Sequence, residues 1–318
     1  MLGAGFSASE QFPLVMGLRA RVLHFLEAER HSSYRMFMEP GNGGHAEGQF
    51  YAGLHEIDPN DTLEFEELLI ALQRRLQNTF AEDPCHTTLR VLKIGCARLL
   101  WCIHNSIWKV GSVYENFVSW LRMPQDSSPN AIVSFNWDVL VERTLADSSV
   151  AWSYWNSDPS VIPVLKPHGS INWSGHLREN LRAEYGGWKP LGQGSRLSYD
   201  SWEPLSNPNK QEINSDLRYM IFPGDPELPD RDEDVRLLWD RISEAVLQRE
   251  AIAFVGYSLP EYDSFATERF KELARGKRVE VYTPNEKHLA RFESVFPKAE
   301  LHKEKFEHSV YAKPSPGC

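Results

Sequence analysis

Two stretches of the chain end an apolar run with polar side chains that could do chemistry. The stretch from Ala131 to Asp138 reads Ala-Ile-Val-Ser-Phe-Asn-Trp-Asp, so residues suited to a buried strand lead directly into Asn136 and Asp138. The stretch 161–170 repeats the pattern, with an apolar run followed by His168 and a glycine. In an open parallel sheet, ligands bind outside the carboxyl ends of the strands. The two stretches therefore predict a site where an amide, a carboxylate and an imidazole meet.

The same residues also have ordinary structural interpretations. Asn136 could cap the helix that begins near Asp138, because asparagine and aspartate favour helix caps. His168 and Gly169 could form a turn in which the ring is already hydrogen-bonded, and Ser258 could cap the next helix.

The chain opens on Met1-Leu-Gly-Ala-Gly-Phe-Ser-Ala-Ser9, a glycine turn followed by small polar residues. Glycines let a backbone approach a phosphate closely, and the N–H groups at a helix start favour negative charge. An ordinary turn is the alternative. Because a phosphate loop of this kind normally follows a buried strand, and only Met1 and Leu2 precede this one, we expect the natural protein to start upstream.

Composition limits the classes of protein to which the chain can belong. Its 318 residues are 42% hydrophobic, which is enough for a real core and too apolar for a disordered chain. A net charge of -10, without a lysine or arginine stripe, argues against nucleic acid as a direct ligand. No apolar run approaches the roughly 18 residues of a membrane span, and the first residues lack the pattern of a signal peptide. We therefore expect a soluble, cytoplasmic protein.

The four cysteines indicate neither a disulfide framework nor a zinc site. None belongs to a CxxC pair, and Cys96 and Cys102 are poorly placed to share one face of a helix. The sequence therefore predicts no metal.

Apolar periodicity predicts a helical layer in the first part of the chain. The expected elements are a helix over 11–29, a glycine-rich loop over 40–61 that could lie over a ligand, a helix from a capping box at Asp61-Thr-Leu-Glu64 to Leu76, and a long helix over 87–123 with a kink at Gly111.

A regular alternation of strands and helices follows an irregular stretch over 174–216, which we interpret as an insertion. The expected elements are strands over 217–222, 251–256 and 278–282 and helices over 234–247, 262–274 and 286–295. Such alternation means parallel pairing with right-handed crossovers. The sequence thus predicts one doubly wound, Rossmann-like α/β domain over 1–318, with a helical insertion over about 11–125.

Four motifs stand in a defined order along the chain, namely Gly3-Ala-Gly-Phe-Ser7, Ser134-Phe-Asn-Trp-Asp138, Lys166-Pro-His-Gly169, and Phe254-Val-Gly-Tyr-Ser-Leu-Pro260 followed by Asp263. This order resembles the sirtuin-like NAD-binding domains, and most closely the bacterial sirtuin-like NAD hydrolases of antiphage defence systems such as Thoeris. The resemblance implies that NAD+ is the substrate and is cleaved to nicotinamide and ADP-ribose. It also implies abortive antiphage defence by NAD+ depletion.

The resemblance implies a role for each matching residue. Asn136 and His168 would perform the chemistry, and Asp138 would lie at the nicotinamide end. The remaining contacts to NAD+ would come from Gly3, Ala4, Gly5, Phe6 and Ser7 at the pyrophosphate, from Gly256, Tyr257 and Ser258 on the phosphate and adenosine side, and from Asn285 at the adenosine ribose.

The chemistry of these side chains suits that reaction. The bond between nicotinamide and ribose breaks through an oxocarbenium-like centre, and the pyridinium leaves as a neutral molecule that needs no general acid. A histidine can take a proton from a ribose hydroxyl or a water, an effect worth roughly 100- to 10,000-fold in typical enzymes. An asparagine can hold the same group by accepting and donating hydrogen bonds at once.

Two departures separate the chain from the deacylating sirtuins. Those enzymes carry a glutamine where this chain has Phe135, and they hold four zinc cysteines in the region that is here 174–216, which contains none. Deacylation and ADP-ribosyl transfer remain as alternatives, and so does a binding module that senses NAD+ or ADP-ribose and signals to a partner.

An unrestrained NAD+ hydrolase would poison its own cell, so we expect the activity to be gated by the segments 40–61 and 174–216. The ten tryptophans, several of them in or beside the insertion, are of the type enriched at interfaces. We therefore expect self-association or a co-encoded partner protein.

Overall fold

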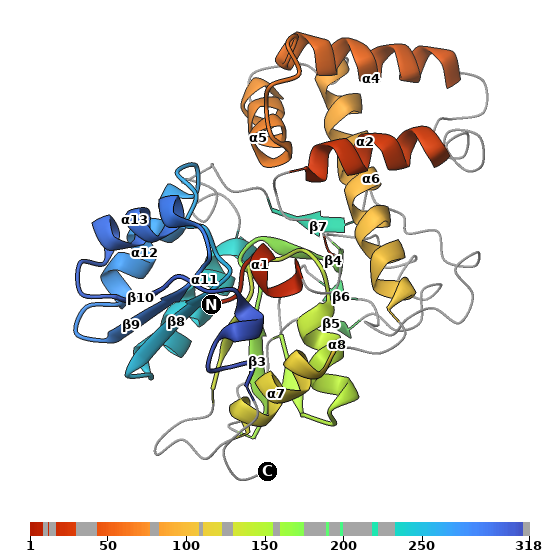
Figure 1. Cartoon of the computed structure of the whole chain (residues 1–318). Coiled ribbons are helices and arrows are strands. Elements are labelled where there is room, and N and C mark those ends of the chain that lie inside the picture. The colour runs from red at the N-terminus through yellow and green to blue at the C-terminus, as the bar shows by residue number, and fades with distance from the viewer. Residues whose placement is uncertain are drawn as a thin grey trace. The chain divides into compact units, whose positions relative to one another are not determined.

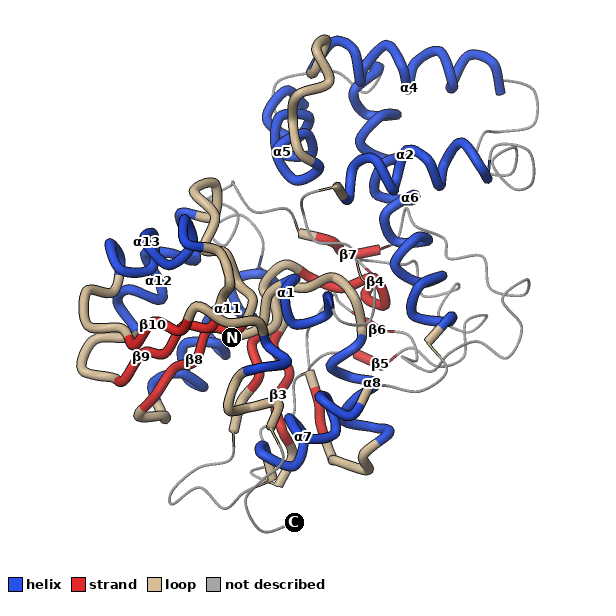
Figure 2. Tube along the Cα trace, viewed as in Figure 1, coloured by secondary structure: helices blue, strands red, loops and turns tan. Residues whose placement is uncertain are grey.

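The chain divides into two compact units. The computed structural model describes residues 1–8, 12, 17–29, 43–76, 83–107, 111–122, 130–154, 160–174, 189–190, 198–199, 218–221 and 233–313. One unit comprises 1–12, 104–206 and 217–318, and the other comprises 13–103 and 207–216. We call the first the α/β unit and the second the helical unit, because every strand of the described residues belongs to the first (Figure 2).

The helical unit contains four helices of the described residues, and the last of them extends beyond it. They are α2 (Leu18–Glu29), α4 (Gly43–Ile57), α5 (Phe65–Leu76) and α6 (Pro84–Ser106). The core of the unit is built by their apolar stripes, for example by Phe65, Leu68, Leu69 and Leu72 of α5, which are buried.

The expectation of a glycine-rich loop over 40–61 is wrong, because α4 occupies most of that segment. Gly53 shows why a glycine is accepted there. A Cβ atom at this position would lie 2.4 Å from the Thr88 hydroxyl and 2.9 Å from the carbonyl carbon of Pro84, so the missing side chain lets α4 lie directly against α6. Close packing between the two helices thus outweighs the low helix propensity of glycine, which costs about 1 kcal/mol per residue.

The single long helix expected over 87–123 is also wrong, because the described residues form two helices there. The first is α6, and the second is α7 (Ser112–Leu121). Gly111 has an extended backbone and stands at the N-cap of α7, so it separates two helices instead of bending one. The helix expected from Asp61 begins later, at Phe65, and the reciprocal capping bond is made by the Glu64 N–H to Glu67 at 3.1 Å.

Among its described residues, the α/β unit contains two parallel sheets. One has the order β1-β3-β2 and consists of β1 (Ile132–Val133), β2 (Trp152–Ser153) and β3 (Ile162–Leu165). The other has the order β10-β9-β8 and consists of β8 (Ala251–Val255), β9 (Arg278–Tyr282) and β10 (Glu300–His302). The strands of 251–255 and 278–282 agree with the sequence predictions, whereas β2 and β10 are not expected from it.

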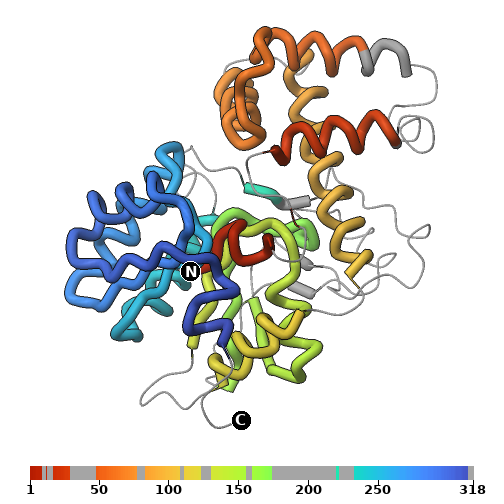
Figure 3. The backbone as a smooth tube through the Cα atoms, in the orientation of Figure 1, coloured from red at the N-terminus to blue at the C-terminus, as the bar shows by residue number. Residues whose placement is uncertain are grey.

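The first residues of the chain connect these two sheets. Leu2 forms parallel bridges to both Ser134 and Val255. Its N–H donates to the carbonyl of Val133 at 2.8 Å, and the Gly3 N–H donates to the carbonyl of Val255 at 3.0 Å. Segments far apart in the sequence therefore lie side by side, and Figure 3 shows the red N-terminal end of the tube beside segments from the middle and the end of the chain.

A third sheet is antiparallel, with the order β5-β6-β4-β7. Its strands are β4 (Gly169–Ser174), β5 (Lys189–Pro190), β6 (Ser198–Tyr199) and β7 (Arg218–Met220). The strand expected over 217–222 is therefore present, but its expected parallel pairing is wrong, because β7 pairs antiparallel with β4. The Gly169 N–H donates to the carbonyl of Lys166 at 2.9 Å, and this turn directs β4 away from β3. Most of 174–216 lies outside the described residues.

Aromatic packing joins the helices of the α/β unit to its strands. The later helices are α8 (Leu140–Asp147), α11 (Glu233–Leu247), α12 (Ser264–Leu273) and α13 (Glu286–Val295), and the last three agree closely with the sequence predictions. The fully buried Phe254 of β8 contacts the rings of Phe270 in α12 and Phe292 in α13, at centroid distances of 5.8 and 5.0 Å. Figure 1 shows these two helices beside the β8–β10 sheet.

The N-terminal turn is held by a second aromatic cluster. Phe6, in the short helix α1 (Ala4–Ser7), is fully buried against Tyr114 and Phe117 of α7 and against Phe306 of a short 3-10 helix (Phe306–His308). The Tyr114 hydroxyl also donates to the carbonyl of Phe6 at 2.7 Å. None of the helices in the described part of the chain is long and apolar enough to cross a membrane.

A buried ion pair in the helical unit gives a pH-dependent prediction. Burial raises the pKa of Asp58, but hydrogen bonds from Thr62, Arg19 and Leu63 outweigh it and hold the pKa below its usual value. We expect Asp58→Asn to lower the free energy of unfolding at pH 7 by about 1.5–3 kcal/mol, the range for hydrogen bonds to charged groups. Because the folded pKa lies below the unfolded one, the stabilisation is complete above the unfolded pKa and is lost as the pH falls toward the folded pKa, so the deficit should shrink below about pH 4.

Urea denaturation across this pH range measures the effect. Asp61→Asn is the matched control, since Asp61 pairs with the same arginine but its side chain is 80% exposed, so we expect little change. Equal losses in the two variants, or a deficit that does not depend on pH, would contradict the interpretation.

Candidate functional site

The pairing of β1 with β3 fixes the positions of Asn136 and His168. Val133 and Leu165 are directly paired, and each of the two polar residues follows three positions later in its own strand segment. Both therefore lie beyond the carboxyl ends of neighbouring parallel strands, as the sequence predicts. Their side chains are largely buried, with exposed fractions of 7% for Asn136 and 5% for His168.

Asn136 links this edge to the N-terminal turn. Its amide nitrogen donates to the carbonyl of Gly3 at 3.1 Å and to the hydroxyl of Ser7 at 2.9 Å. It does not cap the following helix, because α8 begins at Leu140, whose N–H donates to the carboxylate of Asp138 at 3.0 Å. The first N–H of α8 is therefore satisfied by Asp138, the residue before the N-cap Val139, and not by Asn136.

The glycines of the N-terminal turn allow its backbone to lie directly against the turn that follows β8. A Cβ atom on Gly3 would lie 2.5 Å from the Cα of Tyr257, and one on Gly5 would lie 2.8 Å from the Cα of Gly256. Gly256 itself has a φ of 64°, in the left-handed region that glycine tolerates best. The Gly5 N–H donates to the carbonyl of Gly256 at 3.1 Å.

The N-terminal turn has few N–H groups left to bind a phosphate. The N–H groups of Gly3, Gly5 and Phe6 are all hydrogen-bonded within the chain, so a phosphate there would need other donors. Phe6 contributes core packing, Ala4 is half-buried, and the hydroxyl of Ser7 is close to both Asn136 and Asp138. The predicted pyrophosphate contacts of this turn stay predictions.

Asp138 is in contact with a buried network of polar side chains. Burial raises the pKa of the Asp138 carboxyl, although the nearby Lys166 ammonium and the Leu140 N–H act in the opposite direction. The ammonium of Lys166 donates to the backbone carbonyl of Asp138 and forms a 3.0 Å ion pair with Glu142. Glu142 in turn accepts from the hydroxyl of Tyr154 at 2.7 Å. Perturbed carboxyls of this kind are common at functional sites, and buried structural networks produce them too.

His168 forms a hydrogen-bonded cluster with a residue that the sequence analysis does not assign to the site. Its Nε2 lies 2.9 Å from the carboxylate of Asp263, and the hydroxyl of Tyr257 donates to the same carboxylate oxygen at 2.8 Å. The signal for Asp263 is its position three residues after the Gly-Tyr-Ser-Leu-Pro motif and directly before a helix. Its contact with His168 spans 95 residues and is not readable from local sequence.

Aromatic rings complete the surroundings of the imidazole. Phe135 stacks on Tyr257 at a centroid distance of 4.0 Å and meets the His168 ring edge-on at 5.0 Å. The indole N–H of Trp137 donates to the backbone carbonyl of His168 at 2.9 Å. Phe135 therefore supplies an apolar wall beside the histidine and holds its ring in place.

The remaining predicted ligand contacts lie on the later strands. Ser258 follows β8 and is half-buried. Asn285 follows β9 and caps α13, where its side-chain oxygen accepts from the Lys287 N–H at 2.9 Å. The described side-chain contacts of Asn285 are with Lys287 and His288 of the same helix, and none of them joins it to Asn136 or His168.

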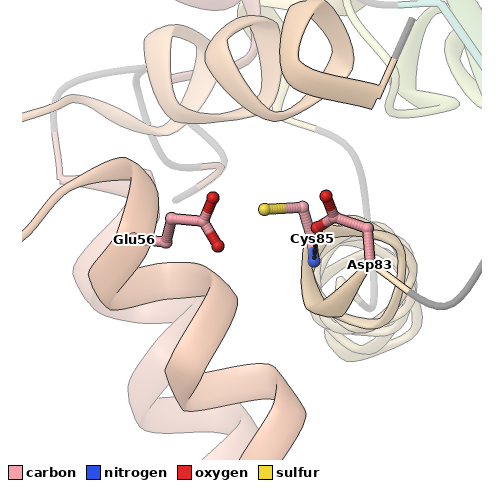
Figure 4. A group of neighbouring side chains, drawn as sticks. All are labelled: Glu56, Asp83 and Cys85. Atoms are coloured by element: carbon pink, nitrogen blue, oxygen red, sulfur yellow. Dashed lines mark hydrogen bonds between the residues drawn. The ribbon is translucent and has the colours of Figure 1, made fainter. Parts of the chain in front are cut away.

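The described residues contain one group with the spacing of metal ligands, and it lies in the helical unit. The donor atoms of Glu56, Asp83 and Cys85 all lie within 4.8 Å of one another (Figure 4). Arg75 forms ion pairs with Glu56 at 3.0 Å and with Asp83 at 3.3 Å, so its single positive charge is shared by the two carboxylates. Burial raises the pKa of the Cys85 thiol to about 12, whereas the thiolate is the form that binds metals. The group is therefore satisfied as an ion-pair cluster.

A cavity of about 110 Å³ lies at the opposite end of the parallel strands. Its lining includes Met1, Trp120, Ile132 and Ala251, which places it at the amino ends of β1 and β8. It is separate from the polar groups at the carboxyl ends and does not belong to the candidate site.

The carboxyl ends of β1 and β3 thus combine an amide, a histidine with a carboxylate partner, and an apolar ring wall. Ligand sites typically combine apolar lining with a few placed polar groups of this sort. The sequence matches no protein-family model, and no curated protein matches it.

The turn-to-turn contact gives a stability prediction. Gly256→Ala combines a strained positive φ with a Cβ atom only 2.6 Å from the backbone of Gly5, whereas Gly276→Ala has a φ of 77° and no atom within 4 Å. We expect Gly276→Ala to cost about 1–2 kcal/mol of unfolding free energy and Gly256→Ala clearly more. Thermal and urea denaturation measure both. Equal losses of unfolding free energy in the two variants would show that the contact between the N-terminal turn and the turn after β8 does not contribute to stability.

Proposed function

We propose that the chain is an NAD+ glycohydrolase that cleaves NAD+ to nicotinamide and ADP-ribose. The observation that carries this proposal is the equivalent placement of Asn136 and His168 beyond the paired ends of adjacent parallel strands. That edge is where nucleotide ligands bind in open α/β sheets. We further propose that the two parallel sheets, bridged by Leu2, form one doubly wound sheet.

The proposed reaction transfers the ribose from a nitrogen to water. As the bond between the ribose carbon and the pyridinium nitrogen breaks, its electron pair neutralises the pyridinium, so nicotinamide leaves without protonation. A water oxygen bonds to the same carbon, and His168 takes the proton that the water loses. Asn136 orients the water or the ribose hydroxyls by accepting through its side-chain oxygen, since its amide nitrogen already donates to Gly3 and Ser7.

Phe135 favours hydrolysis over protein deacylation. Its ring stacks on Tyr257 and meets His168 edge-on, so this position offers an apolar surface and no hydrogen bond to a reacting group. The resemblance to bacterial defence enzymes supports a role in antiphage defence by NAD+ depletion in the cytoplasm. Regulation by self-association or a co-encoded partner belongs to the same proposal. Because 40–61 is mainly helical, 174–216 is the remaining segment proposed to gate the activity.

A second candidate function is a module that binds NAD+ or ADP-ribose without cleaving it. The observation that favours it is the engagement of the Asn136 amide nitrogen with Gly3 and Ser7, which gives this side chain a structural task. Release of nicotinamide from NAD+ separates the two functions. Release that requires an acetylated peptide would point instead to deacylation.

Single substitutions test the catalytic assignments. We expect His168→Ala and Asn136→Ala each to lower the rate of nicotinamide release by about 100- to 10,000-fold, the usual contribution of a positioned base. The dissociation constant for NAD+ should change far less, because the other contacts to the nucleotide remain. Ser258→Ala is the contrast and should weaken binding first. A His168→Ala protein with the parental rate would favour the binding module.

The double substitution tests whether the two side chains act as one unit. Groups that act together are strongly non-additive, so the variant lacking both should be scarcely slower than the slower single variant. Single-turnover rates at saturating NAD+ measure this. Multiplication of the two single effects would show that the residues contribute independently.

A further inference from the structure

Asp263 stands where a helix cap is expected but does not act as one. It is the N-cap residue of α12, and its side chain accepts no capping hydrogen bond from that helix. An aspartate at this position normally accepts from the second or third N–H of the helix, which is worth about 1 kcal/mol. The carboxylate instead faces His168 and Tyr257, at 2.9 and 2.8 Å. Capping of α12 therefore does not explain why an aspartate stands at this position.

The burial of Asp263 makes those two contacts important. The residue is only 4% exposed, and a buried carboxylate is costly unless it is hydrogen-bonded. His168 and Tyr257 are the charged or titratable partners that the described contacts give it, one from the end of β3 and one from the turn after β8. Lys166, the nearest ammonium in sequence to His168, is paired with Glu142 instead.

A strained turn presents Tyr257 and Asp263 to the histidine together. Leu259, between them, has a φ of 51°, which costs a residue other than glycine on the order of 1–3 kcal/mol. The surroundings hold it there, because its side chain is fully buried and its carbonyl accepts from the guanidinium of Arg291. Backbone strain of this kind clusters at functional sites.

We propose that Asp263 is a positioning residue that sets the tautomer of His168. Its carboxylate accepts the Nε2–H of the imidazole, so the neutral ring carries its proton on Nε2 and presents Nδ1 as the basic nitrogen. The Tyr257 hydroxyl fixes the carboxylate in this orientation. A carboxylate behind a histidine both orients the ring and stabilises the imidazolium that forms when the ring takes a proton.

The tautomer can be measured without any enzymatic activity. In the intact protein labelled with 15N-histidine, the neutral His168 ring should show a protonated Nε2 and an unprotonated Nδ1. Asp263→Asn keeps the shape of the side chain and removes its charge. We expect it to weaken this preference, because a neutral amide oxygen accepts the Nε2–H less strongly than a carboxylate, and the amide NH2 can instead donate to an unprotonated Nε2.

Thr267→Val is the matched structural control. The Thr267 hydroxyl donates to the backbone carbonyl of Asp263 at 2.9 Å, so this variant weakens the same helix start without touching the carboxylate. We expect it to lower the melting temperature about as much as Asp263→Asn while leaving the His168 tautomer unchanged. An unchanged tautomer population in Asp263→Asn, or an equal change of that population in Thr267→Val, would overturn the inference.

The kinetic consequence rests on the proposed NAD+ hydrolysis. If that function holds, Asp263→Asn should lower kcat for nicotinamide release by about 100-fold or more with KM within about threefold, and Asp263→Glu should restore part of the rate. A parent protein that releases no nicotinamide would refute the hydrolase proposal, whereas the tautomer measurement would still decide the role of Asp263. A parental kcat in Asp263→Asn would refute the positioning role.

Discussion

The contact between two glycine turns is the constraint on which the α/β unit depends. Gly3 and Gly5 lie so close to Gly256 and Tyr257 that no side chain fits between the two backbones. This approach lets Leu2 bridge both parallel sheets, and it brings Ser7 within reach of Asn136. The same turn carries Tyr257 toward the carboxylate that faces His168. The architecture and the candidate site are therefore consequences of one backbone contact.

Local sequence patterns predict the helices and strands that are specified by residues within the element itself. The strands at 251–255 and 278–282 and the helices that follow them agree with the predictions, because apolar periodicity and caps such as Asn285 are contained within each segment. The positions of Asn136 and His168 are predictable for a related reason. Each residue directly follows a short buried strand, and parallel neighbours bring their carboxyl ends to one edge.

The features that the sequence does not reveal depend on partners far away in the chain. Gly53 is accepted in α4 because of Thr88 and Pro84 on another helix, and glycine content alone suggests a loop. The antiparallel pairing of β7 depends on β4, across a segment that includes most of 174–216. The role of Asp263 is hidden for the same reason, since an aspartate before a helix reads as a cap until the distant imidazole is seen.

The bridging position of Leu2 has a consequence for the order in which the molecule can assemble. The partners of Leu2 are Ser134 and Val255, so the backbone groups of this segment are paired only after residues far along the chain have been made. Contacts of such wide sequence separation close large loops and slow folding. Until they form, the inner edges of β1 and β8 are unpaired strand edges, which are prone to join with other chains. Nascent chains of this protein are therefore most vulnerable to aggregation during the interval in which β1 already exists and β8 has not yet been made.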